Sequence, residues 1–235
     1  AAVWTQEDSK SEAGWWGDTF DTVYVTRVSP GGGWVKTMVD LSDMGFSSDT
    51  AVSITDNGSI VAGWVRSDYT VVNGALSFVA SDVYVRRYIL GSGWTAPVSL
   101  VRTTDSLKGT KVGLDAQGNA VVTWIQNMPA NKGTVATLRA SRLQATGNWT
   151  AAETLSNAGK AVSTPGLAMN AAGQTMVVWA EAQNQGPAIV YARQASAGGA
   201  WGPVTATGSY TGGGSISMDD AGNVAMLSSL NNGTA

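Results

Sequence analysis

The sequence predicts an all-β fold, a β-propeller of four-stranded antiparallel blades, and three observations support this prediction. The chain of 235 residues resembles itself at intervals of about 50 to 60 residues. Each repeat contains four short runs with the residue pattern of β-strands. No stretch shows the 3.6-residue period of an amphipathic helix. Radially stacked sheets that are covered on both faces satisfy all three observations.

Two columns of residues define the repeat. In the first column a glycine stands six residues before a tryptophan, and Trp4 extends the series towards the N-terminus. Its members are Gly58 with Trp64, Gly118 with Trp124, Gly173 with Trp179, and Gly222 with Ser228 in place of the tryptophan. In the second column an arginine precedes a tryptophan by seven or eight residues. Its members are Arg27 with Trp34, Arg87 with Trp94, Arg142 with Trp149, and Arg193 with Trp201.

The four strands of a repeat follow one another in a fixed order. Strand one alternates apolar and small residues, as in Val52-Ser53-Ile54, which favours the crowded innermost position. A tight turn follows (TDNGS, DAQGN, NAAGQ or DDAGN), and its glycine is predicted to adopt a positive φ. Strand two is a continuous apolar run such as residues 120–124, as expected of a strand covered on both faces. Strand three carries Val-Tyr-Val, as at 83–85, and strand four begins at a tryptophan such as Trp94.

These patterns divide the chain into units of one propeller domain or propeller segment spanning residues 1–235. The expected units are 1–48, 49–108, 109–163, 164–213 and a partial unit 214–235, which gives four to five blades. A β-sandwich is the alternative, but it would need one polar face on each strand and no fixed period. Because the chain starts and ends in a strand-two run, we expect a section of a larger propeller, with a native mass above 24.2 kDa.

Composition excludes several functions. The chain has no cysteine and no histidine, which removes the usual zinc sites, Cys or Ser–His nucleophiles and imidazole acid–base catalysis. The net charge of −3 gives no basic footprint for nucleic acid. No apolar run is long enough to span a membrane as a helix. We therefore expect no cofactor, no nucleic-acid partner and no membrane span; calcium among acidic side chains is the one alternative, without EF-hand spacing.

The units GSGWTAPVSL, GTKVGLDAQGNAVVTW and VYVRRYILGSGW resemble propeller repeats that are common in secreted bacterial proteins and are loosely called sialidase-like. The resemblance covers nearly the whole chain and implies a fold, not an activity. The turns approximate the Asp-box of sialidases, S-x-D-x-G-x-x-W. They differ from it because two residues separate the Asp or Asn from the Gly and the Trp stands further on.

One rim of the propeller is predicted to carry the function. Residues 5–22, 65–82 and 125–136 form long connections between strands two and three, whereas 181–188 is short, and long connections commonly carry function. The first of them contains adjacent tryptophans among acidic residues, an arrangement that suits stacking on a sugar ring and bonding to its hydroxyls. The candidate ligand-binding residues are Trp15, Trp16, Glu7, Glu12, Asp18 and Asp21. The alternative is that both tryptophans pack the loop onto the sheet and the acids are solvated.

The repeated tryptophans and arginines are interpreted as packing between blades. A clamp of sialidase type would use arginines at non-equivalent positions, whereas these arginines recur at one position; a repeated lectin site that reuses both columns stays an alternative. Only Glu7, Glu12, Glu153 and Glu181, with the aspartates, could supply a catalytic carboxylate pair. Since spacing singles out no pair, no catalytic residue and no metal ligand is assigned.

The sequence therefore favours a non-enzymatic propeller, secreted or on the surface of a bacterial cell, that binds a glycan or a protein partner through the rim with the long connections. Two alternatives remain at this stage. One is a glycoside hydrolase of sialidase-like fold, and the other is a structural subunit of a surface assembly or filament.

Overall fold

The structure is a computed structural model of the 235-residue chain. It describes residues 1–9, 19–28, 31–38, 45–130, 133–143, 147–157, 159–163, 165–183, 185–209 and 215–227. All regular elements in these residues are β-strands, and every strand pair is antiparallel. The predicted all-β class is therefore confirmed.

The strands form five sheets in chain order, which we name sheets A to E. Sheet A contains β1 (Ala2–Ser9), β2 (Thr19–Arg27) and β3 (Val35–Met38). Sheet B contains β4 (Gly45–Ile54), β5 (Ile60–Val72), β6 (Ala75–Ile89), β7 (Gly93–Trp94) and β8 (Val98–Thr103). Sheet C contains β9 (Ser106–Leu114), β10 (Ala120–Ala130), β11 (Gly133–Leu143) and β12 (Glu153–Thr154). Sheet D contains β13 (Gly166–Met169), β14 (Thr175–Glu181), β15 (Ile189–Ala195) and β16 (Thr205–Ser209), and sheet E contains β17 (Ser215–Met218) and β18 (Val224–Leu227).

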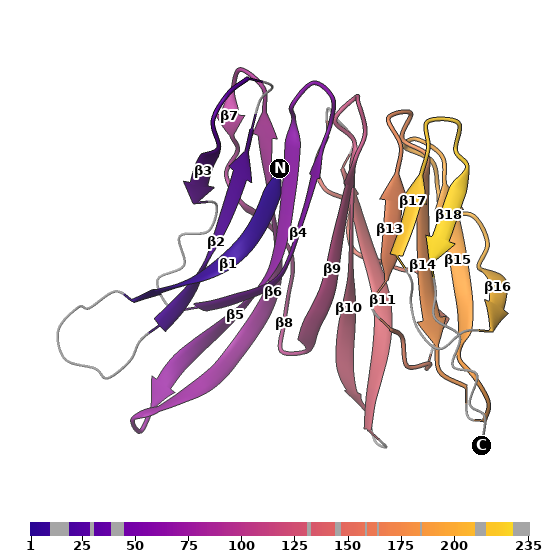
Figure 1. Ribbon diagram of the computed structural model, residues 1–235. Helices are drawn as coiled ribbons and strands as arrows, with labels where there is room; N and C mark the ends of the chain where they lie inside the picture. Colours follow the sequence, from indigo (N-terminus) through magenta and orange to yellow (C-terminus); the bar gives the residue numbers. More distant parts are fainter. Residues whose placement is uncertain are drawn as a thin grey trace.

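The sheets stand side by side in chain order, so that each covers a face of the next (Figure 1). Within sheets C and D the strands are paired in the order of the sequence, as expected for strands one to four of a blade. Strand one of each sheet from B to E lies beside strand one of its neighbour, in the order β4, β9, β13 and β17. The predicted four-strand repeat is thus confirmed for sheets C and D, while sheet B contains five strands and the described part of sheet E contains two. The assignment of unit boundaries and the number of blades stay predictions.

The turn between strands one and two has the same geometry in sheets B to E. The glycine has a positive φ in all four turns, between 82° and 85°, at Gly58, Gly118, Gly173 and Gly222. In each turn this glycine donates its N–H to the carbonyl of the residue three positions earlier, as Gly118 does to Asp115 at 3.1 Å. The predicted turn register is therefore confirmed, and it explains why only glycine occupies this position.

The tryptophans that follow these turns pack between sheets, as predicted. Trp64, Trp124 and Trp179 are at most 1 % exposed. Trp64 lies in one cluster with Val23 and Val25 of the preceding sheet, and Trp124 and Trp179 meet sheets B and C in the same way. A large apolar ring at each boundary fills the space between two sheets, so that the core is a series of interfaces rather than one centre.

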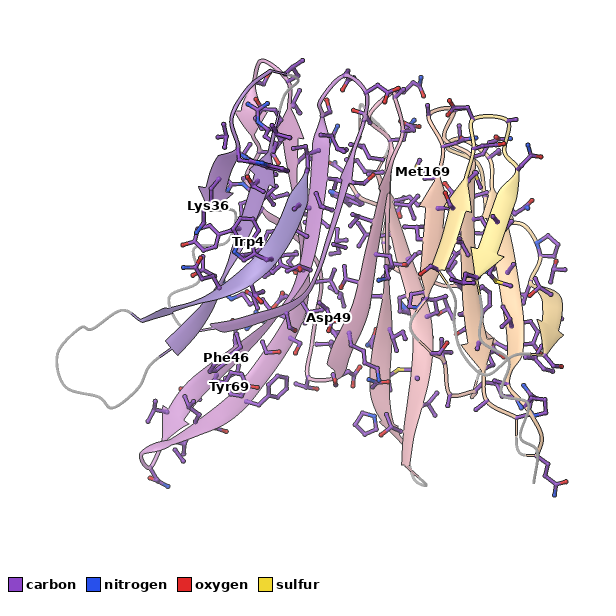
Figure 2. The ribbon with its side chains drawn as sticks, viewed as in Figure 1. Trp4, Lys36, Phe46, Asp49, Tyr69 and Met169 are labelled. Atoms are coloured by element: carbon purple, nitrogen blue, oxygen red, sulfur yellow. The ribbon has the colours of Figure 1, made fainter. Side chains whose placement is uncertain are left out.

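The innermost strands approach one another closely, and glycine makes this possible. A Cβ atom added at Gly113 would lie 2.9 Å from the Cβ of Met169 on the next sheet. Figure 2 labels Met169 at this boundary between sheets C and D. At the boundary between sheets B and C, a Cβ atom on Gly63 would lie 2.9 Å from Val112. The prediction that small residues of strand one mark the crowded inner position is confirmed at Gly113 of β9, whereas Gly63 belongs to β5, a strand two.

The long connections between strands two and three differ from the prediction. Residues 65–82 are not a loop, because β5 continues to Val72 and β6 begins at Ala75, with a two-residue turn between them. In this turn Asn73 has φ 52° and Gly74 has φ 78°, the geometry of a type I′ hairpin. Residues 125–136 are likewise mostly strand, from β10 and β11. The rim therefore carries projecting hairpins (Figure 1), and the apolar and β-branched residues of these segments explain why they pair.

Substitution of two turn glycines by alanine tests how much of the stability depends on contact between sheets. Gly173→Ala is expected to lower the free energy of unfolding by about 2 kcal/mol or more, because a left-handed backbone costs an alanine about 1 kcal/mol and its Cβ would also clash. That Cβ would lie 2.8 Å from the Cβ of Ala197 and 2.7 Å from a carboxylate oxygen of Asp115. Gly74→Ala has the same backbone cost but meets no atom within 4 Å, so about 1 kcal/mol is expected. Urea unfolding of both variants measures the difference, and equal losses would contradict the close contact.

Candidate functional site

The rim that carries the ends of the β5–β6 and β10–β11 hairpins, which we call the projecting rim, was predicted to bind a ligand through the first long connection. Four of the predicted residues lie outside the described part of the chain: Glu12, Trp15, Trp16 and Asp18. For the other two the structure describes only the backbone, in which Glu7 of β1 pairs with Asp21 of β2. The predicted aromatic platform at Trp15 and Trp16 therefore stays a prediction.

Other aromatic side chains lie on the projecting rim. Phe46 from β4 and Tyr69 from β5 meet edge to face, with ring centroids 5.2 Å apart, where the β5–β6 hairpin leaves sheet B (Figure 2). Tyr69 meets Phe78 of β6 in the same way at 5.7 Å, and Phe78 is 42 % exposed. An exposed ring at this place offers a face for a sugar ring or an apolar group.

A charged cluster joins three strands at the base of the same hairpin. Arg102 of β8 places Nη1 2.6 Å from Oδ2 of Asp82 and 2.8 Å from Oδ2 of Asp68. Arg66 binds the other oxygen of Asp68 at 2.9 Å, and Ser99 donates its hydroxyl to the other oxygen of Asp82 at 2.7 Å. All four carboxylate oxygens therefore have a donor, and Asp82 is 1 % exposed. Such a fully paired cluster holds strands together and leaves no carboxylate free for chemistry.

Tyr84 lies beside this cluster and is poorly suited to remove a proton from a substrate. Burial, and next the negative charge of Asp82, raise the pKa of the Tyr84 hydroxyl above its ordinary value. The phenol therefore stays protonated at neutral pH. The hydrogen bond to Asp68 raises the pKa of Arg102, so its guanidinium stays charged. The cluster thus fixes the base of the hairpin and is not a candidate acid–base pair.

A polar groove opens on the same rim beside sheet C, and we call it the Lys108 groove. It has a volume of about 560 Å³ and lies between the β8–β9 connection and the overhanging end of β10–β11. Its lining residues are Thr104, Asp105, Ser106, Lys108, Asn127, Pro129 and Thr134. Ser106 of β9 pairs with Asn127 of β10, which brings a hydroxyl and an amide to adjacent positions.

The groove contains a carboxylate and an ammonium group with bonding capacity left. Gln126 donates to Oδ2 of Asp105 at 2.6 Å, which orients this carboxylate. Within the described part of the chain, Lys108 has no ion pair or hydrogen bond to its ammonium group. A carboxylate, an ammonium, an amide and hydroxyls in one groove are the groups that bind sugar hydroxyls and acidic substituents.

Two glutamates that were considered for a catalytic pair have structural roles. Glu181 at the end of β14 is fully buried. One of its oxygens accepts from Trp179 Nε1 at 2.8 Å and from the backbone N–H of Asn157 at 3.0 Å; the other accepts from the Asn157 amide at 3.1 Å. Glu153 accepts from Trp201 Nε1 at 2.9 Å and pairs with Arg142 at 3.0 Å. Both carboxylates connect segments of the fold and neither reaches the Lys108 groove.

The arginine column connects neighbouring sheets, as interpreted from its periodicity. Arg87 of sheet B donates to the carbonyl of Gly118 in sheet C at 3.2 Å, and Arg142 of sheet C donates to the carbonyl of Gly199 in sheet D. Arg27 lies over the ring of Tyr88 in the next sheet, 4.4 Å from its centroid. The interpretation as packing between sheets is therefore confirmed for these three arginines. Arg193 lies one residue out of their register, because it pairs with Val177 whereas Gln194 pairs with Met176, and it donates to the carbonyls of Gly202 and Thr154.

Sequence reasoning missed the residues of the Lys108 groove. Asp105 and Lys108 carried no motif, because the groove forms between a connection and a hairpin that are adjacent only in the folded chain. The described residues contain no group of three or more His, Cys, Asp or Glu that could hold a metal ion. Within the same residues, no helix has the length and apolar character needed to cross a membrane.

Comparison with known proteins gives similarity of fold. No protein-family model and no curated protein matches the sequence. A polysaccharide lyase, an ulvan lyase, is similar over 88 % of this chain with a TM-score of 0.58 and 15 % identity. The same kind of lyase bound to a glucuronate–sulfated rhamnose unit gives a TM-score of 0.60 and 14 % identity. A protein of unknown function from Dyadobacter fermentans matches 91 % of this chain and 69 % of its own, with 13 % identity and a TM-score of 0.54.

These comparisons correct one expectation. The chain spans about 56 % of the lyases that it resembles. The neighbours of stated activity are β-propeller-like enzymes that act on glycans, so the expectation of a non-enzymatic binding protein is wrong. The sequence contains no motif that separates a binding protein from an enzyme on this fold, because activity depends on a few side chains placed on a shared fold.

Proposed function

We propose that this chain is part of a β-propeller enzyme that cleaves an acidic polysaccharide, and that the Lys108 groove contacts the substrate. One observation carries the proposal: on the projecting rim the groove contains a carboxylate and an ammonium group to which no described residue is paired. The fold, whose neighbours of stated activity process glycans, supports the choice of a polysaccharide. The proposal includes a secreted or cell-surface location, with which a polymeric substrate agrees.

The groups of the groove suggest distinct roles. The Lys108 ammonium would hold an acidic group of the substrate by the attraction between opposite charges. The Asp105 carboxylate, oriented by Gln126, would accept a proton or a hydroxyl hydrogen bond. Asn127 and Ser106 would bind sugar hydroxyls from the same side of the groove.

Activity on a panel of polysaccharides tests this function. The native full-length protein is expected to cleave a uronate-containing polymer, and two readouts separate the chemistries. Elimination gives an unsaturated uronate that absorbs ultraviolet light, whereas hydrolysis gives reducing ends without this absorbance. If neither signal develops on any uronate-containing polymer, the proposal is wrong.

Substitutions in the groove locate the activity. Lys108→Ala and Asp105→Asn are each expected to lower kcat/KM by about 100-fold, the usual effect of removing one charged group that acts on the reacting sugar. Lys111→Ala on the same strand removes an ammonium group that does not line the groove, so its kcat/KM should stay near that of the wild type. Equal losses in Lys108→Ala and Lys111→Ala would exclude the groove.

A further inference from the structure

The boundary between sheets C and D contains a carboxylate at a repeated position. Glu153 of β12 accepts a hydrogen bond from Nε1 of Trp201 at 2.9 Å and forms an ion pair with Nε of Arg142 at 3.0 Å. The guanidinium of Arg142 also lies over the ring of Trp201, 5.8 Å from its centroid. At the outer side of this boundary the carboxylate therefore has both an arginine and an indole N–H as partners.

The boundary between sheets B and C repeats the arginine and the indole but not the carboxylate. The segments Trp94-Thr95-Ala96-Pro97-Val98 and Trp149-Thr150-Ala151-Ala152-Glu153 are equivalent, so Val98 stands where Glu153 stands. The strand pairing agrees, because Val98 pairs with Val85 and Glu153 with Ala140 at the same register. The arginine and the tryptophan of this boundary are Arg87 and Trp149.

An open cavity takes the place of the missing carboxylate. It has a volume of about 690 Å³ and is lined by Arg87, Val98 and Trp149 together with Asn148, Ser99 and other residues, none of them acidic. Among the described residues no carboxylate pairs with Arg87, and no acceptor binds the Trp149 indole N–H. Burial removes water from the Arg87 guanidinium and lowers its pKa. An anion in this cavity would compensate that charge.

We propose that this cavity, the Arg87 cavity, binds the carboxylate of a uronic acid residue in a glycan and so replaces the internal carboxylate found at the next boundary. Arg87 and the Trp149 indole N–H bind the carboxylate, as Arg142 and Trp201 bind Glu153. The Asn148 amide lines the same cavity and offers bonds to sugar hydroxyls. The groups that line the cavity indicate that the ligand carries a carboxylate. The choice of a glycan over an acidic peptide as that ligand rests on the proposed function.

Substitution at position 98 tests the cavity directly. Val98→Glu supplies the internal carboxylate and is expected to weaken binding of an oligogalacturonate at least about tenfold, the ratio that one charge-assisted hydrogen bond supplies. Val98→Thr is nearly the same size and uncharged, so it should bind as the wild type does. Since Val98 is 42 % exposed, neither change should impair folding, and the melting temperature checks this.

Calorimetric titration of the native full-length protein and both variants gives the outcomes. Binding of the oligogalacturonate by wild type and Val98→Thr, with loss in Val98→Glu, supports the site. Unchanged binding in Val98→Glu overturns it, as does equal binding of a carboxyl-reduced oligosaccharide of the same length. A glutamate-rich peptide that binds more tightly than the oligogalacturonate overturns the assignment to a glycan.

Cleavage assays on the same proteins separate this inference from the proposed function. The Arg87 cavity and the Lys108 groove share no lining residue. Val98→Glu is therefore expected to retain cleavage of a short substrate. If Val98→Glu weakens binding but no protein cleaves the substrate, the proposed function is wrong and the Arg87 cavity stands. If cleavage occurs and Val98→Glu leaves binding unchanged, the Arg87 cavity is wrong and the proposed function stands.

Discussion

Trp124→Ala is expected to lower the free energy of unfolding by about 3–5 kcal/mol, the cost of removing a large ring from a packed core. Trp124 is fully buried where sheets B and C meet, in a cluster with Val65 and Val83. Its Nε1 makes no hydrogen bond within the described structure, so the loss measures packing alone. Chemical denaturation followed by circular dichroism gives the value.

Trp34→Ala is the matched control. Trp34 belongs to the other tryptophan column and is 66 % exposed, so its removal should change stability by no more than about 0.5 kcal/mol. A loss at position 34 as large as that at position 124 would show that burial does not account for the effect of Trp124→Ala. It would also contradict the interpretation that Trp124 stabilises the fold by packing between sheets B and C.

Substitution of Glu181 is expected to have the second largest effect on stability. Glu181→Ala leaves the Trp179 indole N–H and the Asn157 backbone N–H without their acceptor. Trp179 is buried, and one buried unpaired donor costs about 1–3 kcal/mol, whereas Asn157 is exposed and can bond to water. Glu181→Gln should cost much less, because its carbonyl keeps both bonds and the Asn157 side-chain amide can rotate to accept from the new NH₂ group.

The pair of variants also separates a structural role from a catalytic one. If Glu181 connects Trp179 to residue 157 and does no chemistry, Glu181→Gln keeps the turnover of the wild type. If Glu181 supplied a catalytic carboxylate, Glu181→Gln would fold normally and lose activity. A stable, inactive Glu181→Gln would therefore contradict the structural role and restore the hypothesis that this residue acts in a carboxylate pair.

Much of the fold could be predicted because the repeat reveals positions at which a single backbone conformation or a single kind of side chain fits. A glycine before each strand two, as at Gly118, marks a left-handed turn, and a tryptophan six residues later marks the boundary between sheets. The hairpin at 65–82 could also have been predicted, since Asn73-Gly74 between β-branched and apolar residues is a strong signal for a type I′ turn. A long segment between two strands indicates a loop only if the strands stay short, whereas here β5 and β6 both lengthen and pair along their whole length.

The candidate sites were harder to predict because one depends on a residue that differs between repeats and the other on residues that meet only in the folded chain. The Lys108 groove joins a connection to a hairpin, and no single stretch of sequence contains it. The Arg87 cavity follows from Val98 in one repeat where Glu153 stands in the next, a difference that has meaning only once the structure shows Glu153 bound to Trp201. Periodicity identifies the shared scaffold, and function here is expected at the departures from it.

The arrangement of the sheets has a consequence for how the molecule unfolds. Among the described residues, the core consists of interfaces between successive sheets. Each sheet therefore exchanges stabilisation mainly with its neighbours in the chain, as in a one-dimensional series of coupled units. Damage at one boundary then opens that boundary first and reaches distant sheets only stepwise. Hydrogen exchange in Trp124→Ala should therefore quicken in sheets B and C while sheet E keeps its wild-type rate, and pulling the chain from its ends should release one sheet at a time.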